Sequence, residues 1–494
     1  MVVASLRSVI RWLEYERMKV SLFLVLNIAV LPLIIIVGSF SHASIALFWI
    51  VSLILGIHFI RPVIKKCGAL QFLSPCFLVY FYSTANYLLG SLYYCTDYLS
   101  RTRLYEEFFG IEHTHLLFII IFLNLCNSIV IIISTKYPVY FYKPLSFPKT
   151  PFKLSAFIIL FALFVILHVF IFDLSVIGGS AKGSQAVKTG TELNYPFIMG
   201  IVMLIVYKLN TYRTPIIFHI AVVGAIVFMM AVDSVGSKRE LFFIILSILM
   251  IEFIYHDRKI RLSFKNVLFV SIIAVLSIYY ILSASIVRGY GGFEVEELTE
   301  AASLVAEYAD NDNFQVVVSN NFEIPYHYAT AVLACEYTLS GKTPLLFGET
   351  FIRPFFIIVP RSIYKPRKMI DVFTTAYDAQ KRLEGISYPV SAYSEFFANF
   401  HILSIPLLIL FFIAYQRLFV LIVKSGRKNK STFLYFMTAV ALSLQFIRGS
   451  GLDSLVIYSI MAGSSIFVGR VLLSIIESPK KTVQKKSSCL SEAV

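Results

Sequence analysis

Charged residues are scarce in this chain of 494 residues: they make up 15% of it, against about a quarter in an ordinary soluble domain. Hydrophobic residues make up 58%, and the mean hydropathy is +0.79. A disordered chain needs low hydrophobicity, so the composition excludes a soluble enzyme and a disordered adaptor together. It predicts an all-α polytopic integral membrane protein.

Cysteines with metal-site spacing are also lacking. The six cysteines are scattered, without a CxxC motif or a neighbouring histidine cluster: Cys67, Cys76, Cys95, Cys126, Cys335 and Cys489. Neither a disulfide framework nor a metal site is indicated, and we expect no metal and no cofactor. The formal charge of +14 would suggest nucleic acid as the partner of a soluble domain, but in a membrane protein it reflects basic cytoplasmic loops. We therefore expect no nucleic-acid partner.

Apolar runs of the ~20 residues that a transmembrane helix needs recur along the chain. An amphipathic segment with Arg7, Arg11 and Arg17 between apolar positions precedes the first run and predicts an interfacial helix. We expect about twelve transmembrane helices, near 20–37, 45–60, 73–94, 116–133, 154–172, 195–207, 215–232, 241–255, 267–287, 397–416, 433–446 and 454–476.

Lys and Arg are distributed unevenly between alternate loops. The side that holds both termini carries 26 of them, against 7 in the five short loops of the opposite side. Because basic residues accumulate in cytoplasmic loops, both termini are predicted to be cytoplasmic.

One loop is exceptionally long. Residues 288–394 form a 107-residue segment on the outer side, with 13 acidic and 9 basic residues, and loops of this length are usually functional. Two apolar stretches inside it, starting at Ile324 and Leu345, are interrupted by Glu336, Arg353 and Pro354, so we expect them to lie on the membrane surface or to dip in from outside. The predicted organisation is nine helices in 1–287, the large loop with interfacial helices in 288–394, three helices in 395–478 and a cytoplasmic tail in 479–494.

Charges are rare inside the predicted spans and cluster at their outer ends, a pattern suited to chemistry on a lipid-linked substrate and unlike that of ion-driven transporters. Lys238 and Arg239 in GSKRE stand at a helix start, where backbone N–H groups favour an anion such as a diphosphate; interfacial anchoring explains them equally well. Arg288 in RGYGGF and Arg448 in IRGSG lie beside glycines that allow close approach of a ligand, or that simply end a helix.

The segments IVPRSIYKPRK and GISYPVSAYSEFFANF are rich in cations and tyrosines. Arg361 can donate hydrogen bonds to phosphate or sugar hydroxyls, and Tyr364, Tyr388 and Tyr393 offer flat rings of the kind on which sugars stack. We expect the next cations, Arg367 and Lys368, to be solvated.

Glu395 stands where the outer loop enters the tenth predicted span. Partial burial would raise its pKa and make it a general base for a sugar hydroxyl, although a glutamate at a helix start is also favoured by the helix dipole. His327 and His401 are further polar candidates, each with a structural alternative.

Several of these motifs together resemble one family. Gly385, Pro389, Ser391, Glu395, Asn399 and Phe400 match the G-x-x-x-P-x-S-x-x-x-E-x-x-x-N-F pattern that ends the large periplasmic loop of Wzy-type O-antigen polymerases, also called oligosaccharide repeat unit polymerases. FGETF (347–351) and PRSIYKP (360–366) resemble further elements of that family, as does GSKRE (236–240). The chain departs from the pattern at His401, where the family commonly has glycine.

The resemblance implies a metal-independent, GT-C-like membrane glycosyltransferase at the periplasmic face of the bacterial inner membrane. Its substrates would be undecaprenyl-diphosphate-linked glycans among the membrane lipids, and a chain-length regulator and a flippase would be its partners. Glu395 would act as the base, and cations would stabilise the leaving diphosphate. The implied catalytic residues are Glu395 and Arg288, the diphosphate-binding residues Lys238, Arg239, Arg361 and Arg448, and the sugar-binding residues Tyr364, Tyr388, Tyr393, Asn399 and His327.

Two alternatives remain open. An O-antigen ligase uses the same donor but transfers the glycan to the lipid A core. A lipid-linked oligosaccharide flippase is a transporter with about twelve spans, but its short loops and polar cavities fit this sequence less well.

Overall fold

The computed structural model describes eleven continuous stretches of the chain, and its regular elements there are helices. These stretches are 19–32, 41–67, 74–95, 103–139, 153–172, 195–233, 298–310, 324–356, 367–379, 388–426 and 451–477, with isolated residues between them. The all-helical prediction holds for this described part.

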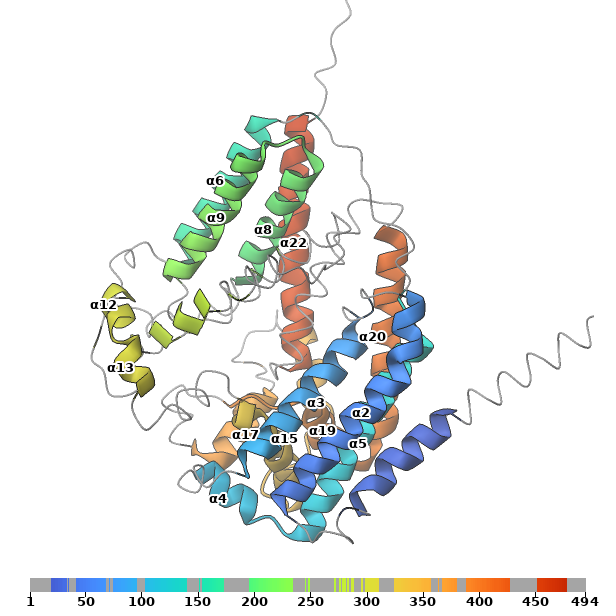
Figure 1. Ribbon diagram of the computed structural model, residues 1–494. Coiled ribbons are helices and arrows are strands. Elements are labelled where there is room, and N and C mark those ends of the chain that lie inside the picture. The colour runs from blue at the N-terminus through green and yellow to red at the C-terminus, as the bar shows by residue number, and fades with distance from the viewer. Residues whose placement is uncertain are drawn as a thin grey trace, which may run out of the picture.

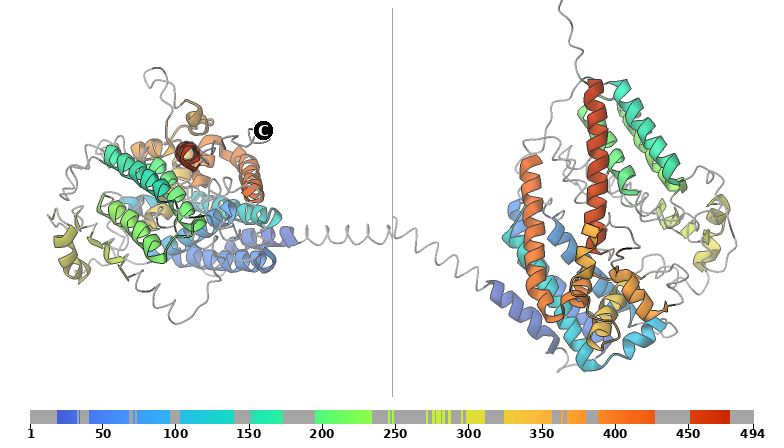
Figure 2. Two further views of the ribbon diagram at one scale, coloured as in Figure 1. Left: turned by 90° about the horizontal axis from the view of Figure 1, so that it is seen from above. Right: turned by 180° about the vertical axis from the view of Figure 1, so that it is seen from behind.

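The helices form two groups (Figure 1). In the first, long helices pack side by side around shorter ones: α2 (His42–Cys67), α3 (Pro75–Tyr93), α5 (His113–Lys136) and α20 (Ser404–Gly426) with α4 (Arg103–Phe109), α15 (Ile324–Leu339) and α19 (Ala392–Phe400). The second contains α6 (Leu154–Phe172), α8 (Tyr195–Thr211), α9 (Ile216–Asp233) and α22 (Leu452–Glu477), with α8 and α22 in closest contact. The view from behind in Figure 2 shows the same separation.

Shorter elements lie at the lower end of Figure 1 and beside the second group. The helix α16 (Glu349–Ile352) and the 3-10 turn η7 (Arg353–Phe356) contact α22, and so join the two groups. The remaining short elements are α12 (Leu298–Ser303), α13 (Val305–Asp310), α17 (Met369–Tyr377) and the 3-10 turn η8 (His401–Leu403).

Four described helical segments are long and apolar enough to cross a membrane: His42–Lys65, His113–Lys136, Leu455–Ile475, and Ala392–Ser425, which runs from α19 through η8 into α20. Their outer surfaces carry exposed aliphatic and aromatic side chains, among them Ile54, Leu418 and Phe467. Apolar surfaces of this extent require an apolar environment, and the composition and the helices together identify a membrane protein.

The predicted spans coincide with helices where the structure describes them. Helices α2, α3, α5, α6, α8, α9, α20 and α22 occupy expected apolar runs. The expected spans 241–255 and 433–446 lie outside the described residues or include only isolated ones, and 267–287 is described only at scattered positions. The total of twelve crossings therefore stays a prediction.

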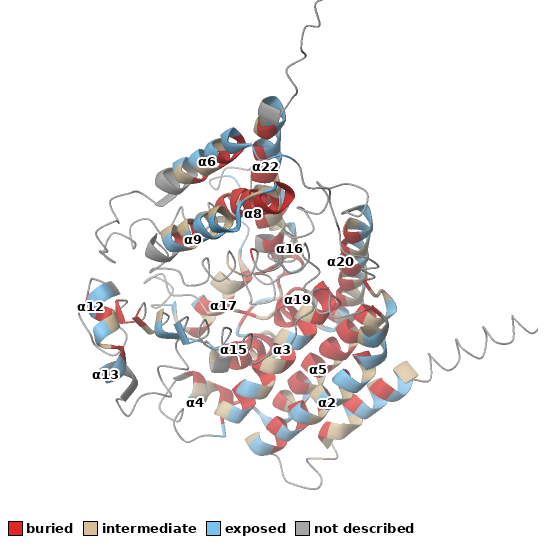
Figure 3. Ribbon diagram, turned by 45° about the horizontal axis from the view of Figure 1, so that its top comes forward, coloured by how far each residue is buried: buried red, intermediate tan, exposed pale blue. Residues whose placement is uncertain are grey.

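The apolar stretch that starts at Ile324 was expected either to lie on the membrane surface or to dip in from outside. It forms helix α15, which does not lie on a surface. It packs against α3, α5 and α19, and Tyr328, Val332 and Cys335 are fully buried. A surface-lying helix would expose one face, so α15 enters the bundle instead. Buried residues concentrate at this meeting of α3, α5, α15 and α19 (Figure 3).

Small side chains and buried hydrogen bonds bring the helices close. At Gly200 in α8, an added Cβ would lie 1.9 Å from Ser465 Oγ in α22, so that only glycine permits this approach. Ser52 Oγ lies 3.0 Å from Asn27 Oδ1 and 2.7 Å from Asn124 Oδ1. Small residues at contacts and polar links between helices are characteristic of packing within membranes.

Candidate functional site

Helix α19 carries three of the family-like residues on one face. Ser391, Glu395 and Asn399 follow one another at four-residue intervals, which places them along the same side of a helix. Ser391 begins the helix: its Oγ accepts a 3.1 Å hydrogen bond from the backbone N–H of Ser394, as expected for an N-cap serine. The cap sets where the helix begins, and hence the face on which Glu395 and Asn399 lie.

Glu395 lies inside the bundle, with 2% of its surface exposed. The sequence predicted a residue at the edge of an aqueous loop, with partial burial. The difference arises because α19 packs between α15 and α20, and Ser394 Oγ donates a 2.7 Å hydrogen bond to the carbonyl of Ala331 in α15. A buried carboxyl group is a candidate for proton transfer.

Asn399 connects α19 to the FGETF segment. Its Nδ2 donates hydrogen bonds to Thr350 Oγ1 at 2.9 Å and to the carbonyl of Glu395 at 2.7 Å. Asn399 is fully buried, and its Oδ1 has no hydrogen-bond partner in the described part of the chain. A buried acceptor without a partner is costly and uncommon in folded proteins; because Asn399 is covered on all sides, Oδ1 could accept a substrate hydroxyl only if the helices around it opened.

The FGETF segment is held against α19 by its backbone and its rings. The N–H of Leu346 donates a 3.0 Å hydrogen bond to the carbonyl of Ala398. Gly348 has φ +86°, and an added Cβ would lie 3.3 Å from the ring of Phe400. The Phe351 ring packs edge-on against Phe396 at 4.7 Å. The left-handed backbone favours glycine at 348, and a Cβ there would press tightly on the Phe400 ring.

Glu349 joins the same segment to the end of the basic motif. Its carboxylate accepts hydrogen bonds from the backbone N–H and from Nε of Arg367, both at 2.8 Å, and Nη2 of Arg367 is 2.6 Å away. Arg367 thereby holds the pKa of Glu349 below its usual value. The sequence predicted a solvated Arg367; it is half-exposed but ion-paired, because the folded loop brings Glu349 beside it.

His401 interrupts the helix after α19. Its φ of +48° and ψ of −123° lie in a region that L-residues rarely adopt and glycine adopts readily. The resemblance leads one to expect glycine at this position, and glycine would adopt these backbone angles without strain. The His401 ring packs against Phe397 at 4.9 Å.

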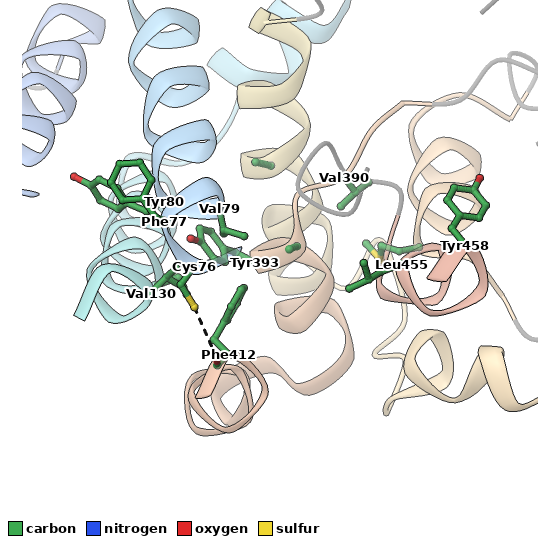
Figure 4. Packing of buried hydrophobic residues seen from close by; sticks show 14 of the residues in the cluster. Cys76, Phe77, Val79, Tyr80, Val130, Val390, Tyr393, Phe412, Leu455 and Tyr458 are labelled. Carbon is green, nitrogen blue, oxygen red and sulfur yellow. Dashed lines mark hydrogen bonds between the residues drawn. The ribbon is translucent and has the colours of Figure 1, made fainter. Parts of the chain in front are cut away.

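Two of the predicted sugar-binding residues are positioned by internal contacts. Tyr393 is 1% exposed; its hydroxyl donates a 2.7 Å hydrogen bond to Asn127 Oδ1, and its ring lies in the core near Phe412 (Figure 4). Its faces are covered, so it is a packing residue in this conformation. His327 is buried as well, with Nε2 3.3 Å from the Tyr82 hydroxyl.

Tyr388 keeps a partly exposed side chain. Its ring packs edge-on against Tyr377 at 5.0 Å and lies 6.5 Å from Tyr326. This small group of tyrosines retains a surface on which a sugar could stack.

The predicted cationic residues lie outside the described residues, as does one tyrosine: Lys238, Arg239, Arg288, Arg361, Arg448 and Tyr364. Their roles stay predictions. Within the described ranges, no group of three His, Cys, Asp or Glu residues could hold a metal ion.

The sequence reasoning missed a second polar cluster. Glu336, treated as an interruption of an apolar stretch, lies 3.1 Å from Nδ1 of His115. It lines an open hollow of about 330 Å³ together with Glu107, Tyr337 and Lys342. The isolated glutamate in an apolar run was the available signal. His115 and Glu107 are more than 200 residues away from it in the sequence, so spacing could not identify them.

Comparison of the chain with protein-family models, with curated proteins and with solved structures finds no match.

Proposed function

We propose that this protein is an O-antigen polymerase, a membrane glycosyltransferase of the periplasmic face that joins undecaprenyl-diphosphate-linked repeat units into a polysaccharide. The proposal includes about twelve transmembrane helices, a GT-C-like arrangement, a large periplasmic loop, and an inner-membrane location with both termini cytoplasmic.

One observation carries the proposal: sequence elements recognised separately as family-like meet in space. Asn399 of the pattern on α19 contacts Thr350 of FGETF, and Glu349 of FGETF contacts Arg367, which directly follows PRSIYKP. Nothing in their separation along the chain requires these contacts. Contacts of this kind between separate elements, next to the helix that carries Glu395, are what a shared catalytic site would produce.

The proposed reaction uses Glu395 as the base. The carboxylate takes the proton of an acceptor hydroxyl, the oxygen attacks the anomeric carbon of the donor, and the bond from that carbon to the diphosphate breaks. Undecaprenyl diphosphate leaves with the bonding electron pair. Arg288, Arg239, Arg361 and Arg448 are proposed to stabilise its negative charge, with Lys238 assisting.

A ligase would use the same undecaprenyl-diphosphate-linked donor as a polymerase. A flippase would form no covalent bond. A strain that lacks the gene distinguishes the three. Its surface lipopolysaccharide is separated on a gel, and the glycan left on the lipid carrier is measured. If the protein is a polymerase, the strain that lacks it is expected to carry lipid A core with a single repeat unit attached. Polymer that accumulates on the carrier would indicate a ligase, and absence of repeat units from the periplasm would indicate a flippase; either result overturns the proposal.

A further inference from the structure

The second polar cluster lies at the end of the first helix group, where α4, the start of α5 and the C-terminal end of α15 meet. An open hollow of about 330 Å³ is lined there by five charged or hydroxyl-bearing side chains, Glu107, Glu336, Tyr337, Ser340 and Lys342, and by Gly110, Ile111 and Leu333. Its size falls within the range of sites for small ligands. It is separate from the buried carboxyl group of Glu395.

The two carboxylates of the hollow are held in place. Glu336 is 15% exposed and has both oxygens within 3.2 Å of His115 Nδ1. Glu107 is 23% exposed; it accepts a hydrogen bond from the Tyr337 hydroxyl and lies 3.4 Å from Lys342 Nζ. An ionised carboxylate offers about four acceptor positions, so each glutamate can accept ligand hydroxyls in addition to these bonds. Fixed acceptors reduce the entropy lost when a ligand binds.

The charges of the cluster restrict the class of ligand. Two glutamates stand against one lysine and one histidine, so the hollow does not favour a phosphate or another anion. The described residues also form no group of three His, Cys, Asp or Glu side chains that could hold a metal ion. A ligand rich in hydroxyl groups matches carboxylate acceptors and an ammonium donor.

The hollow is connected to α19 through α15. Ser394, the neighbour of Glu395, is bonded to the carbonyl of Ala331, and Glu336 follows Ala331 by five residues. At 1.5 Å per residue this is about 7.5 Å along the helix axis. Glu336 also lies about 140° around the helix from Ala331, so α15 links the two places through different faces.

We propose that this hollow is a binding subsite for sugar residues of the glycan, in which Glu336 and Glu107 accept sugar hydroxyls and His115 positions Glu336. The inference rests on the proposed function for its choice of glycan. It adds a subsite that recognises the carbohydrate without its lipid carrier and without the diphosphate.

The test measures binding apart from polymerisation. The purified full chain in detergent is titrated with carrier-free oligosaccharides released by mild acid from the surface polysaccharide of the source strain. Binding is followed by calorimetry. For Glu336→Gln and Glu107→Gln, affinity is expected to fall about tenfold each, since a charge-assisted acceptor becomes a weaker amide. Glu106→Gln is the matched control, because Glu106 is the exposed neighbour of Glu107 on α4 and does not line the hollow.

The outcomes separate this proposal from the polymerase assignment. Unchanged affinity in both variants, or no binding by the wild-type chain, overturns the subsite. The gel of the deletion strain reports on the polymerase independently of either result. The melting temperature of each variant is measured alongside. If one of the two glutamate variants fails to fold, the other variant and Lys342→Gln test the subsite in its place. Lys342→Gln is also expected to weaken binding.

Discussion

The side-chain amide of Asn399 donates a 2.9 Å hydrogen bond to the hydroxyl of Thr350. These residues are 49 positions apart, and the bond holds the FGETF segment against the helix that carries Glu395. The contact therefore couples the stability of the loop to the geometry of the proposed base.

Removal of the Thr350 hydroxyl tests this coupling. Thr350→Val leaves one buried amide hydrogen of Asn399 without its acceptor, which costs about 1–3 kcal/mol. We expect a lower melting temperature in detergent and reduced polymer. Thr114→Val is the control, because the Thr114 hydroxyl is exposed and its loss should have little effect. Equal melting temperatures for the two variants would contradict the role assigned to Thr350.

The ion pair of Glu349 and Arg367 predicts a pH dependence of stability. The pKa of Glu349 is lower in the folded protein than its usual value, chiefly because of the hydrogen bond from Arg367. The pair therefore stabilises the fold above the unfolded-state pKa of about 4.3, and this contribution disappears as the pH falls through the lowered value. Unfolding midpoints from pH 7 to pH 3 should converge for wild type and Glu349→Gln at the acid end. A constant difference between them would refute the assignment.

His401 has a left-handed backbone, and His401→Gly should relieve it. A non-glycine residue in such a conformation costs about 1–3 kcal/mol, while the contact of the His401 ring with Phe397 is lost. We expect a net gain of roughly 1 kcal/mol in the free energy of unfolding. The control is Ser464→Gly, because Ser464 is an exposed residue inside the helix α22; there glycine should destabilise by about 0.5–1 kcal/mol. A destabilised His401→Gly would show that the ring contact outweighs the strain.

Tyr393 is expected to affect stability and not the chain length of the product. Tyr393→Phe removes the hydrogen bond to Asn127 and should cost about 1–2 kcal/mol. The polymer made at a permissive temperature should keep its wild-type length distribution on a gel. A shortened distribution from a fully folded variant would instead support a contact between Tyr393 and sugar.

Glu395→Gln keeps the volume of the side chain and removes the base. Loss of a general base typically lowers the rate by about 10²–10⁴-fold, so polymer should be absent at unchanged protein level. Glu112→Gln, at an exposed glutamate, should leave the polymer unaltered. Wild-type glycan length in Glu395→Gln would remove Glu395 from the catalytic set.

The helices were predictable because each depends on a local property, the length of an apolar run, and α5 or α9 is identified without knowledge of any other helix. The position of α15 depended on distant partners: Glu336 interrupts an apolar run in the sequence, but in the fold it stands near the end of the helix beside His115.

The sequence alone also did not predict in which direction the side chain of Tyr393 points. It precedes Glu395 by two residues, or about 200° around a helix, and so points away from the proposed base. This follows only once Ser391 is known to begin the helix. The sequence motifs identified the residues of the candidate site. The position at which the helix begins showed which of these residues lie on the same face.

Polymerisation by the purified protein tests the central claim most directly. The wild-type chain and Glu395→Gln are reconstituted in lipid vesicles with single repeat units on undecaprenyl diphosphate, and the products are separated by length. The account predicts a ladder of carrier-linked polymer and release of undecaprenyl diphosphate with the wild type, and neither with Glu395→Gln. Repeat units that remain single in the presence of folded wild-type protein would contradict it.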